Sequence, residues 1–269
     1  MSNGSNGHSA GGQYLHVEVG GDGIVVVTMH RPPANALNRG LMDELRTVAV
    51  SCSGPEPPRA VILRSALEGI FMAGADLKML DNGWDDMVAT TRAFQEAGNA
   101  WERIPAPTIA AIAGHAAGGG CEMALCCDFR IMARGTATIG LPEVRWGLLP
   151  AGGGTQRLAR LLGRAAALDL ILRGRMIDAD AAERCGLITE ACEPEEIDGR
   201  ARGLAAELAT LPPLALGEIK RCILEGLEVH LAAGLALEER GIVALSRTAD
   251  TREGVNSFVE RRRPVFVGR

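Results

Sequence analysis

Two glutamates stand beside glycine-rich segments, where a carboxyl group could act as an acid or a base. Glu122 follows the run Gly118-Gly119-Gly120-Cys121, which leads from an expected strand into a helix. A carboxylate is favourable in the first turn of a helix, so Glu122 is either a charge that complements the helix dipole or a catalytic group. Glu143 follows Pro142 in a mostly apolar stretch. There it either faces solvent or occupies a low-dielectric pocket, whose raised pKa is the condition that a general acid needs.

The glycines before Glu122 indicate a second kind of chemistry. Glycine lets the backbone turn sharply and approach a ligand closely. The first amides of the following helix point outward, with the positive end of the helix dipole behind them. Residues 112–122 therefore predict a site for an anion or an oxyanion. The sequence contains no GxGxxG fingerprint, P-loop or GxSxG elbow, which removes three common reasons for a glycine-rich helix start.

The hydrophobic pattern places these segments in an α/β chain. Strand-like alternation begins near Tyr14, and further strands are expected at residues 24–29, 60–64, 108–113 and 129–133. Helices are expected after the Asn38 cap, at 86–103 and at 154–162. This alternation predicts an α/β architecture with right-handed crossovers. From about Glu195 onward the pattern is helical, with an apolar stripe that must be buried on the chain's own core or on a neighbouring subunit.

Three regions follow from this pattern and from composition. Residues 1–13 are rich in serine, glycine and asparagine and are expected to form a disordered tail. Residues 14–197 are expected to form the core that carries the site, and residues 198–269 a helical C-terminal region. With 269 residues and 47% hydrophobic content, the chain can bury a sizeable core.

Net charge and the pattern of cysteines limit which classes of partner the chain is expected to bind. The net charge of −5 gives no reason to expect nucleic acid, and no run approaches the about 20 apolar residues of a membrane helix. The run Arg261-Arg262-Arg263 is interpreted as a solvated helix end, while a contact with the phosphates of a small ligand stays open. Seven scattered cysteines, with no CxxC pair and no histidine at metal-ligand spacing, indicate reduced thiols of a cytoplasmic protein and no metal site.

Taken together and in order, the glycine-rich segments resemble those of the enoyl-CoA hydratase/isomerase (crotonase) superfamily. The matching segments are residues 31–38, 73–77, 118–122, 141–143 and 153–158. The resemblance covers nearly the whole chain after the tail. It implies a spiral of ββα units, followed by a C-terminal helical region that forms trimers, which commonly pair into hexamers.

The same resemblance gives roles to four catalytic residues. It places the amides of Ala75 and Gly119 in an oxyanion hole for a thioester carbonyl. Family members that hydrate a 2-enoyl-CoA carry glutamates at the positions of both Glu122 and Glu143, whereas simple isomerases usually keep only the second. We assign water activation mainly to Glu122 and protonation of the α-carbon mainly to Glu143. Their titrations are expected to be coupled if both hold the same water.

Eight further residues are assigned to the substrate by resemblance. They are Arg31, Ala34, Ala73, Asp76, Leu77, Lys78, Gly118 and Ala151. The loop at 73–78 matches one that cradles the adenine end of coenzyme A, mainly through backbone atoms, although Arg31 and Lys78 read equally well as surface charges. Many hydratases have glycine where Ala151 stands, at the helix start close to the catalytic water. No metal, flavin or nicotinamide is expected, since coenzyme A is part of the substrate.

The resemblance thus predicts an enoyl-CoA hydratase, a hydro-lyase that reversibly converts a 2-enoyl-CoA thioester into a 3-hydroxyacyl-CoA. Fatty-acid metabolism is the commonest context in the family. Two other reactions fit the same oxyanion hole: double-bond isomerisation, and dehydration of a specialised hydroxyacyl-CoA such as a carnitinyl thioester. A non-catalytic homologue that binds coenzyme A thioesters is the alternative from a different class.

Overall fold

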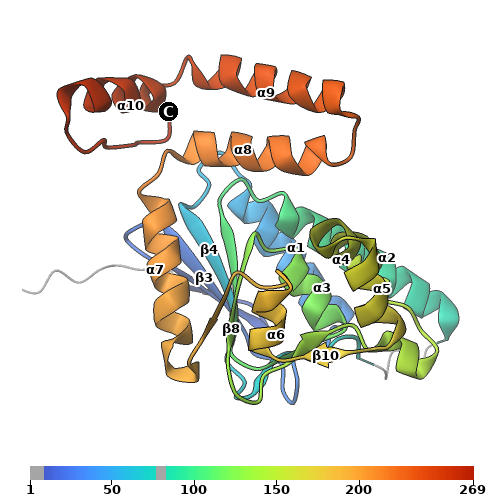
Figure 1. Cartoon of the computed structure of the whole chain (residues 1–269). Coiled ribbons are helices and arrows are strands. Elements are labelled where there is room, and N and C mark those ends of the chain that lie inside the picture. The colour runs from blue at the N-terminus through green and yellow to red at the C-terminus, as the bar shows by residue number, and fades with distance from the viewer. Residues whose placement is uncertain (1–8, 77–82) are drawn as a thin grey trace, which may run out of the picture.

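The computed structural model describes residues 9–76 and 83–269 (Figure 1). Leu77 and Lys78, which the resemblance assigned to the adenine loop, lie outside the described residues. Within these residues the strands form two sheets. The larger sheet has the order β1 (Ser9–Gly11), β2 (Leu15–Val19), β3 (Ile24–Met29), β4 (Ala60–Ser65), β6 (Thr108–Ile112), β8 (Phe129–Ala133) and β11 (Glu190–Cys192). The smaller sheet has the order β10 (Met176–Ile177), β9 (Ile139–Gly140), β7 (His115–Ala117) and β5 (Ile70–Met72).

The centre of the larger sheet is parallel, and its strands are nearly continuous apolar runs because both faces are covered. Side chains on β3 alternate between the two faces, as the strand period requires. Val25 and Val27 join the core under one layer of helices, whereas Ile24 joins a second core on the opposite face. The sheet therefore separates two hydrophobic cores.

The larger core lies under helices α1 (Arg39–Cys52), α2 (Trp84–Glu102) and α3 (Gly119–Leu125). The chain continues through the short 3-10 helix η2 (Glu143–Trp146), α4 (Gly154–Leu162), α5 (Arg164–Leu172), α6 (Ala179–Arg184) and the 3-10 helix η3 (Pro194–Glu196). Asn38 caps α1 as expected, because its side chain accepts a hydrogen bond from the amide of Leu41 at 2.9 Å. The helices on this face thus place the N-termini of α3 and α4 in the same part of the molecule (Figure 1).

Strand β1 and helix α7 lie across two of the regional boundaries expected from the sequence. Residues 9–11 belong to strand β1, which pairs with β2, so the expected disordered tail does not extend to residue 13. Helix α7 (Ile197–Ala209) covers the second face of the sheet with Ile197, Ala201 and Ala205. Its small buried side chains let it lie close to the strands. The core therefore includes α7, and the separate helical region begins after it.

That region contains α8 (Pro213–Gly226), α9 (Leu231–Leu245) and α10 (Ala249–Glu260), which form a layer beyond the end of the sheet (Figure 1). The ammonium group of Lys220 on α8 binds the Asp128 carboxylate at 2.7 Å. Asp128 also accepts a hydrogen bond from the amide of Thr108 at 2.8 Å, at the start of β6. This ion pair fastens the C-terminal helices to the sheet. None of the described helices is long and apolar enough to cross a membrane.

Candidate active site

Glu122 is buried at the N-terminal end of α3, with only 3% of its surface exposed. The chain enters α3 through Gly118, whose φ of +54° lies in the region that glycine adopts without strain. The carboxylate Oε1 of Glu122 accepts a hydrogen bond from the amide of Gly154 at 2.8 Å. Gly154 is the first residue of α4, so the carboxylate also lies at the positive end of that helix.

Glycines of residues 152–154 are needed for this approach. A Cβ atom added to Gly154 would lie 3.0 Å from Oε1 of Glu122. One added to Gly152 would lie 2.7 Å from Oε2 and would collide with the ring of Phe94. The sequence predicts the helix that starts at residue 154, but it does not predict the contact of these glycines with Glu122. The contact joins residues 32 apart in the chain, and no local pattern reports such an approach.

Glu143 lies against Gly118, in the glycine turn that precedes α3. It begins η2 and is partly buried. A Cβ atom added to Gly118 would lie 2.8 Å from Oε1 of Glu143, so the carboxyl group rests directly on the turn that precedes α3. The other oxygen, Oε2, is buried and has no hydrogen-bond partner among the described residues. The two glutamates expected to work together are therefore brought to one place.

Burial changes the acidity of both carboxyl groups. It raises the pKa of Glu122 to about 7; the amide of Gly154 opposes this shift, and the charge of Glu143 adds to it. The amide of Gly152 and the charge of Arg157 oppose it further. Burial also raises the pKa of Glu143. If the two carboxyl groups carry one proton between them, that proton is favoured on Glu122 in the free chain, because Glu122 is more deeply buried. The roles that we assign to the two residues require the proton on Glu143 instead.

The backbone around Ala75 leaves its amide free for a ligand. Leu37 pairs with this segment through two hydrogen bonds. Its amide donates to the carbonyl of Gly74 at 2.7 Å, and its carbonyl accepts from the amide of Asp76 at 3.0 Å. The N–H of Ala75 belongs to the same planar trans peptide group as the Gly74 carbonyl, so it points in the opposite direction, away from Leu37. Among the described residues it donates to no acceptor, and neither does the N–H of Gly119.

The segments that carry these two free amides lie against each other. A Cβ atom on Gly74, which has a φ of +93°, would lie 3.2 Å from the nitrogen of Gly119 and 2.9 Å from the carbonyl oxygen of Ala117. Glycine at position 74 is therefore required for the close approach. Two unused N–H groups on adjoining backbone segments, beside the carboxyl groups of buried Glu122 and partly buried Glu143, can stabilise negative charge that develops on a carbonyl oxygen.

The assigned nucleotide residues are held together by their own contacts. Arg31 forms a 2.7 Å ion pair with Asp76 and donates to the carbonyl of Ala36 at 2.7 Å. Its guanidinium also lies over the ring of Tyr14, 5.7 Å from the ring centre. Arg31 and Asp76 are thus engaged with each other, and they tie the segment 31–36 to the loop that carries Ala75.

Ala34 and Ala151, which the resemblance also assigned to the substrate, form hydrogen bonds through their backbone carbonyls. The carbonyl of Ala34 accepts the amide of Ala73 at 3.0 Å, which continues the link between the two segments. The carbonyl of Ala151 accepts a hydrogen bond from the Gln95 side chain at 2.6 Å. Ala151 is not among the residues with positive φ, so alanine fits here without backbone strain.

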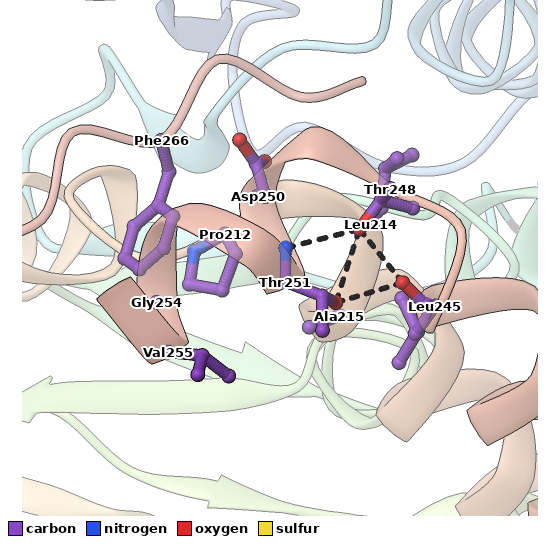
Figure 2. A pocket seen from close by; sticks show the side chains of 10 residues that line it. All are labelled: Pro212, Leu214, Ala215, Leu245, Thr248, Asp250, Thr251, Gly254, Val255 and Phe266. Carbon is purple, nitrogen blue, oxygen red and sulfur yellow. Dashed lines mark hydrogen bonds between the residues drawn. The ribbon is translucent and has the colours of Figure 1, made fainter. Parts of the chain in front are cut away.

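A separate cavity of about 250 Å³ lies among the C-terminal helices (Figure 2). The start of α8, the junction of α9 and α10, and Phe266 line it. Its carboxylate, Asp250, is occupied by the amides of Val267 and Gly268 at 2.7 and 2.8 Å. None of the segments that carry Glu122 or Glu143 reaches this cavity. In residues 9–76 and 83–269, no three His, Cys, Asp or Glu side chains are arranged to hold a metal ion.

The fold is shared with known proteins. A model of the enoyl-CoA hydratase/isomerase family matches residues 20–269. A probable enoyl-CoA hydratase of Rhizobium meliloti is 40% identical over 250 residues, which are 91% of this chain and 95% of that protein. The probable mitochondrial enoyl-CoA hydratase 2 of Arabidopsis thaliana is 39% identical over 248 residues, covering 91% of this chain and 82% of that protein. The crystal structure of an enoyl-CoA hydratase from Bacillus anthracis matches with a TM-score of 0.91 at 35% identity, over 96% of this chain and 100% of that chain.

These similarities define the class of protein as an α/β protein of the crotonase fold, with mixed sheets and a helical C-terminal region. The chain belongs to the enoyl-CoA hydratase/isomerase family. The fold class and the family expected from the sequence are both confirmed.

Proposed function

We propose that this chain is an enoyl-CoA hydratase, which adds water reversibly across the C2=C3 bond of a 2-enoyl-CoA thioester. One observation carries the proposal. Two carboxyl groups, buried Glu122 and partly buried Glu143, meet at the glycine turn whose Gly119 amide has no hydrogen-bond acceptor among the described residues. Hydration needs one group to deprotonate water and another to protonate carbon, and a pair fits this need better than a single carboxyl group.

In the proposed mechanism the thioester oxygen accepts hydrogen bonds from the amides of Ala75 and Gly119. Ionised Glu122 takes a proton from water as the water oxygen bonds to C3, and the electrons of the double bond move towards the thioester as an enolate. Protonated Glu143 then gives its proton to C2. One amide of such an oxyanion hole typically contributes about 100- to 1000-fold in rate. The cycle ends with the proton on Glu122, and exchange with water resets the pair.

Substrate binding moves the shared proton from Glu122, its favoured place in the free chain, to Glu143, where the mechanism needs it. Glu143 is only partly buried, so an acyl group that covers it would remove water and raise its pKa further. Glu122 keeps its hydrogen bond from Gly154, which favours its ionised form. The proposed chemistry uses these side chains and backbone amides, and coenzyme A enters as part of the substrate. We place its nucleotide near the linked segments of Arg31 and Asp76.

We further propose that the chain forms a homotrimer or a dimer of trimers and works in the cytoplasm. Large apolar side chains are exposed on the C-terminal helices, and another copy could bury them. All seven cysteine thiols are free, which supports a reducing compartment.

The direct test supplies purified protein with crotonyl-CoA and follows loss of the conjugated enoyl absorbance. We expect 3-hydroxybutyryl-CoA to form, and we expect Glu122→Gln and Glu143→Gln each to lower kcat by about 100-fold or more. Glu56→Gln changes an exposed carboxylate in the same way and is expected to leave kcat unchanged.

Two outcomes would reverse the proposal. Conversion of a 3-enoyl-CoA into its 2-enoyl isomer without hydration would make the chain an isomerase. Equal activity in the wild type and both site variants would separate the glutamates from the reaction.

A further inference from the structure

Arg157 on α4 connects that helix to α2 and to the glycine loop at residues 152–154. Its Nε and Nη2 atoms bind the two carboxylate oxygens of Glu102 on α2 at 3.1 and 3.0 Å. Nη2 also donates to Asn99 at 2.7 Å, and Nη1 donates to the carbonyl of Gly152 at 3.2 Å. Only 13% of the Arg157 side chain is exposed. The paired, planar geometry of this contact fixes the guanidinium in one orientation.

The loop that Arg157 holds is the one that binds Glu122. Three successive glycines, residues 152–154, have little conformational preference of their own. Gly153 has a φ of +116°, and a Cβ atom there would collide with the Arg157 guanidinium, which therefore lies directly on the loop backbone. Because Gly154 donates to Glu122, any rotation of the preceding peptide groups would move that donor away from the carboxylate. An external clamp on the loop is therefore needed.

Arg157 also contributes charge. Its positive charge opposes the rise of the Glu122 pKa that burial causes. The titratable groups coupled to Glu122 or to Arg157 in this region are Glu143 on η2, Glu102 on α2, and the buried thiols of Cys121 and Cys126 on either side of Glu122. The thiols stay neutral, because burial raises their pKa values far above the neutral range. The Glu143 carboxylate makes protonation of Glu122 easier, and the positive charge of Arg157 acts against that effect.

We propose that Arg157 is a positioning residue for Glu122, which holds the 152–154 loop against α2 so that the Gly154 amide stays on the Glu122 carboxylate. The inference rests on the proposed hydratase function and goes beyond it, because Arg157 touches neither the substrate nor the reacting atoms. Its charge serves the same end by favouring ionised Glu122 and leaving the shared proton to Glu143.

The test compares four variants in the crotonyl-CoA assay over a range of pH. Arg157→Gln removes the charge and the paired contact, and we expect kcat to fall by about 10- to 100-fold with little change in KM. Without the positive charge the pair holds its proton more tightly, so the alkaline limb of kcat/KM moves to higher pH. Arg157→Lys keeps the charge, so we expect its limb to stay at the wild-type pH while kcat still falls.

The other two variants separate the clamp from general damage. Glu102→Gln keeps the cation and weakens the clamp, so kcat falls without a move of the limb to higher pH. Arg160→Gln makes the same change as Arg157→Gln at an exposed position of the same helix and is expected to behave as wild type. Thermal melting shows which variants fold; if Arg157→Gln does not, Arg157→Lys and Glu102→Gln carry the test.

Hydrogen exchange gives a readout without substrate. We expect the backbone amides of residues 150–156 to exchange faster in Arg157→Gln than in the wild type, because the clamp no longer restrains the loop. Unchanged exchange there, or a kcat and an alkaline limb like those of the wild type, would overturn the inference. A wild type without hydratase activity would instead reject the proposed function, while the exchange experiment would still decide whether Arg157 restrains the loop.

Discussion

A buried carboxyl group holds its proton more tightly than one in water, and a second carboxylate nearby strengthens that effect. At the proposed active site both conditions apply to Glu122, and burial alone raises the pKa of Glu143. Backbone amides and Arg157 act in the opposite direction on Glu122. The pKa of Glu122 is therefore set by groups from α4, from the loop before it and from η2, and the pair is expected to carry one proton near neutral pH.

The pH dependence of kcat/KM follows from this balance. The active form of the free protein is the pair with one proton, since hydration uses one base and one acid. Activity is expected to fall as the pH rises through about 7, where Glu122 loses the shared proton. It falls on the acid side when a second proton enters the pair, through a Glu143 pKa that is itself raised.

The profile of kcat reports the complex, where the acyl group covers Glu143. Its alkaline limb is expected at higher pH than that of kcat/KM, because covering Glu143 makes loss of the shared proton harder. Steady-state measurements with crotonyl-CoA from about pH 5 to pH 9 would show both limbs. A kcat/KM that stayed constant across this range would contradict the assignment of the two glutamates.

At the scale of elements, the position of α3 depends on how closely its first turn approaches β5. A Cβ atom on Gly120 would collide with the carbonyl oxygen of Met72, so the helix start lies directly on the strand backbone. Gly120→Ala is expected to lower the free energy of unfolding by about 3 kcal/mol, since backbone cannot move aside as a side chain can.

Gly203→Ala is the matched control for this change. Gly203 lies inside α7, and nothing lies within 4 Å of the position that its Cβ would occupy. Alanine is the better helix former by roughly 0.5 to 1 kcal/mol, so this variant is expected to be more stable than the wild type. Urea unfolding of the three proteins measures both effects. Equal stability of the two variants would mean that α3 does not depend on its close approach to β5.

The elements that could be predicted from sequence are those with strong local signals. Strand β8 and helix α4 have the expected bounds, the first because it is an apolar run and the second because glycines flank it. Strand β1 was missed because its serine, alanine and glycine carry no strand signal and it is ordered by pairing with β2. Helix α7 was placed outside the core because a sequence pattern does not show which surface its alanines meet.

The features of the proposed active site also separate into those with a local sequence signal and those that depend on contacts between distant segments. The resemblance of the glycine and glutamate segments to those of the family predicted which residues carry chemistry, because each segment spans only a few positions. The hydrogen bond from Gly154 to Glu122 and the clamp formed by Arg157 and Glu102 join distant segments, and the sequence assigned no role to Arg157, although it lies in the matching segment 153–158. Both depend on the sheets and helices being assembled first.

At the scale of the whole molecule, the C-terminal helices expose several large apolar side chains. Phe258 is 85% exposed, Leu231 78% and Val259 74%. Charged and polar residues lie between them, yet these large side chains face outward from α9 and α10 and are not covered by the described part of the chain. These helices form a layer beyond the end of the sheet (Figure 1), and we expect association with further copies to bury their apolar side chains.

We therefore expect the protein to have a native mass of three or six times its chain mass of 28.3 kDa. Phe258→Asp places a charge in the apolar surface and is expected to shift the protein towards monomers, since an unpaired charge is costly to bury. Val50→Asp is the control, because Val50 is 60% exposed on α1, outside the C-terminal helices. Light scattering after size-exclusion chromatography measures the masses. A monomeric wild type, or equal masses for Phe258→Asp and Val50→Asp, would show that these helices do not hold the subunits together.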